Sequence, residues 1–115
     1  MKFKNAEALQ IWSVLQRVNE TGRLGYAIAK NRRKFGDELK EYVEARDGII
    51  RQFGVVRDGE DHIYDLPTEK AQEVNDLDSM DCEIDVTQVD DNVFCSGGLI
   101  TDDMVMLDWM VNGGI

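Results

Sequence analysis

The sequence predicts an α+β fold: an N-terminal antiparallel helical hairpin with one long helix, a small antiparallel β-sheet and a buried C-terminal helix. Three observations predict it. Residues spaced three and four apart form one stripe from Leu24 to Phe53. An Asp-Gly pair lies between two short runs of β-forming residues, and the segment after Thr101 is apolar on nearly every side of a helix.

The first two helices form the predicted hairpin. Asn5 is expected to cap a helix that ends near Asn19, and a short polar connection then leads to a helix over Gly22 to Phe53. At 1.5 Å per residue the second helix is roughly 48 Å long, more than twice the length of the first. Its Leu39 to Phe53 part therefore needs cover from elsewhere in the chain or from a second subunit.

The small sheet is predicted after the long helix. The Asp58-Gly59 pair indicates a β-hairpin over about 55 to 64, and Pro67 begins a short surface helix that ends near Asp78. Apolar and acidic residues alternate over 82–88, so we expect a strand that joins the hairpin in one sheet.

The last part of the chain is predicted to be a loop followed by a helix. Residues 90–98 have loop composition, and Thr101 is expected to cap a helix that ends at Val111. A helix this apolar must be buried on several sides. We expect it to cover the exposed end of the long helix.

Charge is distributed very unevenly along the chain. Residues 1–54 carry a net charge of +4 and residues 55–115 a net charge of −14, within one domain that spans 1–115. Nucleic acid and anionic membranes are therefore disfavoured as partners, since phosphate binding needs clustered lysines and arginines. A basic protein surface is favoured instead. No run is long and apolar enough for a membrane span or signal peptide, so we expect a cytoplasmic protein.

No catalytic or metal-binding signature is present in the sequence. His62 would need Cys82 or Cys95 as a nucleophile, and nothing in the pattern brings them together. The acidic residues around Asp78 lack the glycine and the distal glutamate of a calcium-binding loop. We therefore predict neither enzymatic activity nor a cofactor. The cysteines are interpreted as packed thiols of a reducing compartment.

Two polar residues on the stripe of the long helix, Asn31 and Arg46, are expected to meet polar groups of the C-terminal segment. A basic cluster lies beside Asn31. This cluster consists of Lys30, Arg32, Arg33 and Lys34. We expect it to pair with the protein's own acidic half or with an acidic partner.

Several short motifs resemble a family of small bacteriophage and prophage proteins of unknown function. They cover most of the chain and are Met-Lys-Phe-Lys-Asn at 1–5, Tyr-Ala-Ile-Ala-Lys-Asn at 26–31, Glu-Leu-Lys-Glu-Tyr at 38–42 with Ala45-Arg46, Leu-Ile-Thr at 99–101 and Leu-Asp-Trp-Met at 107–110. The resemblance implies a phage context in a bacterial cytoplasm. It does not extend to residues 90–98 or to the Gly-Gly-Ile tail.

Two functional hypotheses follow. In the first, the chain is a non-enzymatic interaction factor, an accessory protein or adaptor that binds a phage or host protein. In the second, its acidic half imitates nucleic acid and inhibits a host DNA-binding or defence protein. The candidate partner-binding residues are Asp58, Glu60, Asp61, Asp90 and Asp91, and the candidate contacts of a homodimer are Tyr42, Ile49, Ile50 and Phe53.

Overall fold

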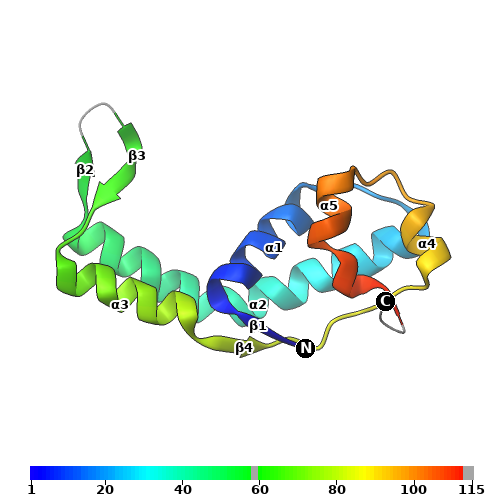
Figure 1. Cartoon of the computed structure of the whole chain (residues 1–115), viewed down its shortest axis with the longest axis horizontal. Helices are drawn as coiled ribbons and strands as arrows, with labels where there is room; N and C mark the ends of the chain where they lie inside the picture. The colour runs from blue at the N-terminus through cyan, green and yellow to red at the C-terminus, as the bar shows by residue number, and fades with distance from the viewer. Residues whose placement is uncertain (58–59, 113–115) are drawn as a thin grey trace.

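The long helix α2 (Gly22–Phe53) is the axis of the molecule, and its bounds are those that the sequence predicts. The computed structural model describes residues 1–57 and 60–112, and it describes side chains outside 56–64. The molecule measures 48 × 30 × 22 Å along its principal axes. Figure 1 shows α2 running through most of this length, so every other element is placed along it.

Helix α1 (Asn5–Arg17) packs beside the first half of α2 and completes the predicted hairpin. Gly22 makes the connection possible, because its φ of 66° lies in the left-handed region that other residues rarely adopt. Arg32 of α2 then donates from Nε to the Leu15 carbonyl (2.8 Å) and from Nη2 to the Val18 carbonyl (3.0 Å). The last carbonyls of α1 are thereby capped by the neighbouring helix.

The predicted single sheet is wrong, because the structure has two separate two-stranded sheets. Strands β2 (Val55–Arg57) and β3 (Glu60–Asp65) form the predicted antiparallel hairpin, whose turn lies outside the described residues. Strand β4 (Asp81–Glu83) is shorter than the predicted 82–88 strand and pairs with β1 (Lys2–Lys4) at the start of the chain. The alternation over 82–86 nevertheless marks a buried face, with Cys82 and Ile84 inside.

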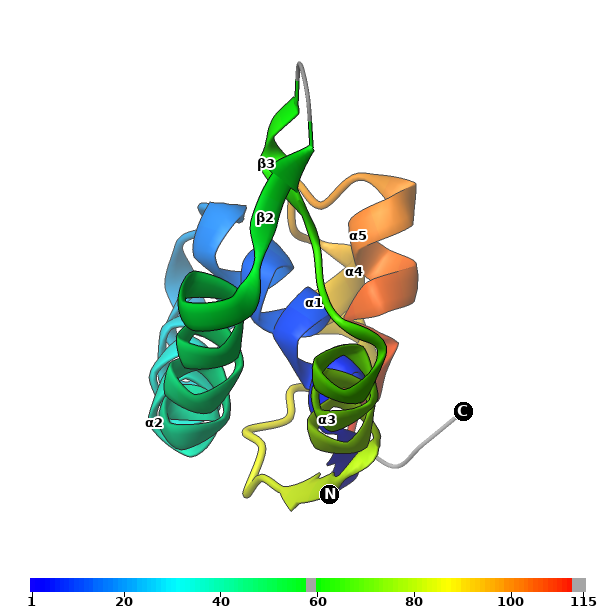
Figure 2. The same ribbon diagram turned by 90° about the vertical axis from the view of Figure 1, so that its left-hand side faces the viewer.

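Helix α3 (Thr68–Ser79) covers the second half of α2, the position that we predicted for the C-terminal helix. Figures 1 and 2 show α3 and α2 side by side, with the β2–β3 hairpin beyond them. We call this part, comprising residues 43–53 of α2 together with β2, β3 and α3, the arm. The remaining elements are called the body.

The C-terminal segment instead packs on the body. It consists of a short helix α5 (Thr101–Met106) and a 3₁₀ turn, Asp108–Met110. Trp109 lies against Phe3 of β1 and Phe35 of α2, with ring centroids 5.8 and 5.4 Å away. Leu107 and Met110 are fully buried, whereas Val105 is 67% exposed. The segment is therefore buried on one side only, contrary to the prediction.

Three local predictions also need correction. Asn5 does not cap α1, because its side-chain amide donates to the Leu77 carbonyl of α3 at 2.9 Å. Thr101 is the first residue of α5 and makes no side-chain cap. The predicted loop over 90–98 contains a short helix, α4 (Asp91–Cys95), which places Phe94 in the core.

Candidate functional site

An open groove of about 510 Å³ lies between the start of α2 and residues 87–93, which are extended as far as Asp90 and then enter α4, and we call it the α2 groove. At one end of the groove, Asn31 of α2 contacts the lining residue Thr87. This fully buried side chain donates from Nδ2 to the Thr87 carbonyl (2.9 Å) and accepts from the Thr87 N–H (2.7 Å). The amide thus pairs with the backbone as a neighbouring strand would. Asn31 therefore meets a polar group, as predicted, but it is the backbone of Thr87 and not a group of the C-terminal segment.

Beyond Thr87 the chain turns away from α2 and opens the groove. The Val89 N–H donates to the Met110 carbonyl and the Val89 carbonyl accepts from the Asn112 N–H, both at 2.7 Å. These bonds hold the segment against the C-terminal residues instead of α2. The facing side of α2 carries Gly22, which has no side chain, and Ala27, which has only a methyl group, so the space is left unfilled.

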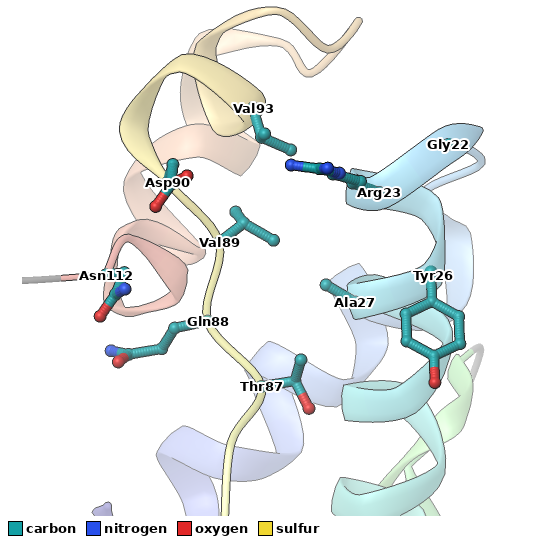
Figure 3. Close-up of a pocket in the computed structure, with 10 residues that line it drawn as sticks. All are labelled: Gly22, Arg23, Tyr26, Ala27, Thr87, Gln88, Val89, Asp90, Val93 and Asn112. Atoms are coloured by element: carbon teal, nitrogen blue, oxygen red, sulfur yellow. The ribbon is translucent and has the colours of Figure 1, made fainter.

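The lining combines an apolar floor with charged and aromatic groups at the edges. Val89 and Thr87 point toward α2, and Arg23 reaches across the groove toward Val93 (Figure 3). Tyr26 is 66% exposed, and the ammonium of Lys30 lies 5.3 Å from the centre of its ring. Such a lining can hold apolar side chains together with polar groups of a bound segment.

A second, smaller groove lies on the arm, and we call it the arm groove. It has a volume of about 300 Å³ and is lined by Ile49 of α2, by Glu73, Asp76 and Leu77 of α3, and by Met80, which follows α3. Met80 is 56% exposed, while Ile49 and Leu77 are half-buried.

Polar contacts fix the base of the arm. The buried hydroxyl of Tyr42 donates to Oδ1 of Asp78, and Nε of Arg46 lies 3.5 Å from the same oxygen. Burial, and then the hydrogen bond to Asp78, raise the pKa of Tyr42 well above its ordinary value. Arg46 therefore meets a polar group, as predicted, but one on α3 and not on the C-terminal segment. Arg46 belongs to the arm, whereas the α2 groove is lined by the first residues of α2, toward the other end of this helix.

The structure does not gather the predicted acidic partner-binding residues into one described site. Asp90 borders the α2 groove and Asp91 begins α4, and both are exposed. Asp58 lies outside the described residues, as do the side chains of Glu60 and Asp61. Lys34 of the basic cluster does contact the acidic half, because its ammonium donates to the Asp85 carbonyl at 2.7 Å.

The structure buries one of the four predicted dimer-contact residues and leaves the other three accessible. Tyr42 is buried within the chain and bonded to Asp78, so it is not available to a partner. Ile49, Ile50 and Phe53 are half-exposed on the arm, and the Lys70 ammonium lies 4.4 Å from the centre of the Phe53 ring. Dimer formation through these three residues stays a prediction, which sedimentation at high micromolar concentration tests.

The other reactive side chains of the described part of the chain form no recognisable active site. Cys82 is a buried free thiol, as predicted, whereas Cys95 is exposed on α4 and hydrogen-bonded to Asp91. Their pKa values are both raised, by burial at Cys82 and by the Asp91 hydrogen bond at Cys95. Such thiols are weak nucleophiles. Among the described residues, no three His, Cys, Asp or Glu side chains gather at one point.

Comparisons with protein-family models, curated proteins and solved structures find no match for this chain. Within its described residues, no helix combines the length and the apolar composition that crossing a bilayer requires.

Sequence reasoning missed the α2 groove. Tyr26 and Arg23 lie off the apolar stripe of α2, and in sequence they look like ordinary solvated residues. The available signal was the pair of small residues, Gly22 and Ala27, on a helix face that also carries an aromatic side chain. The partner segment 87–93 could not be assigned to this face without knowing that Asn31 holds Thr87.

Proposed function

We propose that this chain is a non-enzymatic interaction factor of a bacteriophage or prophage that binds a phage or host protein through the α2 groove. The phage context rests on the sequence resemblance, and the mode of action rests on the groove. The observation that carries the proposal is the exposed Tyr26 beside Arg23 at the edge of an open, partly apolar groove.

Tyrosine and arginine are the residue types that most often dominate protein–protein binding energy. Here both stand on a helix whose backbone is already fixed, so binding orders their side chains but no backbone. Among the contacts described, the Arg23 guanidinium has no carboxylate partner within the chain. A bound segment that supplies an acceptor would therefore gain a charge-assisted hydrogen bond without breaking an existing one.

The groove favours a protein segment over an enclosed small molecule. It is more open than enclosed, so a small ligand would remain largely in contact with water. An extended or helical segment of a partner can cover the groove and continue over the exposed residues around it.

Site-specific photocrosslinking tests the proposal. A benzophenone amino acid is placed at Tyr26 and, as a matched control, at Val105, because these residues are 66% and 67% exposed. In a bacterial host that carries the phage, we expect one dominant protein adduct at position 26 that is absent at position 105. Adding Arg23→Glu should reduce its yield. The same adducts at both positions, or none above background, would contradict the proposal.

The alternative function, imitation of nucleic acid, is favoured by the exposed carboxylates of Asp85, Asp90 and Asp91 along one segment. Its weakness is that the other described carboxylates of the acidic half are spread over the end of β3, α3, β4, α5 and the 3₁₀ turn. For a mimic, the captured partner should release the chain between about 0.05 and 0.5 M salt, where screening of surface charge changes strongly, and DNA should compete for the same site. An adaptor held by apolar contacts should remain bound.

A further inference from the structure

We propose that the arm groove is a second docking site, which takes a basic amphipathic segment of a partner protein. Apolar side chains of the segment would contact Ile49, Leu77 and Met80, and its lysines or arginines would lie against Glu73 and Asp76. This site is separate from the α2 groove and does not depend on the function proposed for it.

The floor of the arm groove is apolar and accessible. Ile49 and Leu77 come from two helices that lie side by side, so the floor is set by rigid elements. Met80 follows the last turn of α3, where its N–H donates to the Leu77 carbonyl at 3.3 Å. With 56% of its surface exposed, its flexible side chain can adapt to different apolar partners.

The rim of the groove is acidic, so it favours a positively charged segment of a partner. Helix α3 carries Glu69, Glu73, Asp76 and Asp78 against a single base, Lys70. Lys70 is already engaged, because its ammonium lies 3.1 Å from Glu73 Oε1 and 4.4 Å from the centre of the Phe53 ring. Asp78 lies 3.5 Å from Arg46 of α2 and Glu73 is paired with Lys70, so Glu69 and Asp76 are the carboxylates of α3 that have no basic partner among the contacts described.

An apolar floor between two helices with carboxylates at its edge complements a helix that has an apolar stripe flanked by cations. Membrane surfaces and nucleic acids are repelled by the same carboxylates. A second copy of this chain is disfavoured as well, since its own arm would bring another acidic α3 toward the rim.

Binding of a synthetic peptide to the full chain tests this site. The probe is a fluorescein-labelled amphipathic peptide of about 18 residues, built from leucine and lysine at helical spacing and followed by fluorescence anisotropy. Met80→Asp is compared with Val105→Asp, because both residues are exposed and both variants add one negative charge. We expect Met80→Asp to weaken binding at least about tenfold and Val105→Asp to leave it within about twofold.

A second pair of variants distinguishes the effect of the rim carboxylates on binding from the effect of the net charge of the protein. Glu73→Lys with Asp76→Lys should weaken binding strongly, whereas Asp102→Lys with Asp108→Lys, which changes net charge equally, should have a small effect. All four replaced carboxylates belong to exposed residues, so folding is expected to survive in both variants.

Equal effects within either pair would overturn the proposal, because general attraction to an acidic protein would then explain the binding. Sedimentation of the unliganded chain supplies a further check. If the parent is a dimer and Met80→Asp makes it a monomer, the groove belongs to self-association and the proposed occupant is wrong. Neither result bears on the photocrosslinking at Tyr26.

Discussion

Replacing Asn31 should destabilise the fold far more than a surface asparagine would. In the variant Asn31→Ala, the Thr87 N–H and carbonyl lose the partners that now lie at 2.7 and 2.9 Å. Two net hydrogen bonds are worth about 1 kcal/mol each, and partly buried groups left unpaired add a further cost. We expect the free energy of unfolding to fall by about 2 to 5 kcal/mol.

Thermal unfolding measures this effect. A loss of 1 kcal/mol lowers the Tm of a domain of this size by about 4 °C or more, so Asn31→Ala should lose roughly 10 °C. Asn75→Ala is the control, because Asn75 is exposed on α3 and surface substitutions usually stay within about 0.5 kcal/mol. A Tm within about 2 °C of the parent for Asn31→Ala would refute the proposed role of the amide.

The variant Asn31→Asp makes the test sharper through its pH dependence. An ionised carboxylate at this buried position can accept from the Thr87 N–H but repels the Thr87 carbonyl. Burial raises the pKa of the introduced carboxyl above its unfolded value, so its stabilising protonated form is lost as pH rises. The deficit relative to the parent should therefore shrink between pH 7 and pH 4. That of Asn31→Ala should not change in this way, and equal pH profiles for the two variants would refute the mechanism.

Three further outcomes are expected. Leu107→Ala should cost about 2 to 5 kcal/mol because it opens a cavity at a fully buried position, whereas Val105→Ala on the exposed side should cost little, and melting curves compare the two. Gly48→Ala should raise stability by up to about 1 kcal/mol, since an added methyl group meets nothing within 4 Å; a lower Tm would contradict this. Because burial and Asp78 raise the pKa of Tyr42, the stability that it contributes is present below about pH 10 and lost as pH rises further, and Tyr42→Phe should lack this loss in alkaline unfolding experiments.

Local patterns in the sequence predicted α1, α2 and α3 well because each of these helices carries its own evidence, whereas α4 was missed and the C-terminal helix ends at Met106 and not at Val111. The stripe of α2 is long, its glycine start is required by the turn, and its end is marked by Gly54. The polar residue Asn31 on this stripe also indicated a specific contact, which the structure confirms. The length and the ends of α2 depend on neighbouring residues, whereas the contact partner of Asn31, Thr87, lies 56 positions further along the chain.

Long-range pairing could not be predicted in the same way. Strand β1 has three residues, too few to show a period, and its partner β4 lies about eighty positions further along the chain. To predict the position of the C-terminal segment, one would need to know which element packs against each half of α2. Stacking of Trp109 with Phe35 and the hydrogen bond of Tyr42 to Asp78 decide this, and neither is visible as a sequence pattern.

The chain leaves the body for the arm after Tyr42 and comes back to the body near Asp78. These two residues are hydrogen-bonded to each other, so the arm begins and ends at the same point of the body. The body therefore places no restriction on the length of what lies between them. One seven-residue repeat added to α2 and one to α3 would carry the hairpin about 10 Å further out while the same helix faces stay together. The same body can thus carry arms of different reach, with the distance between the β2–β3 hairpin and the body as the adjustable quantity.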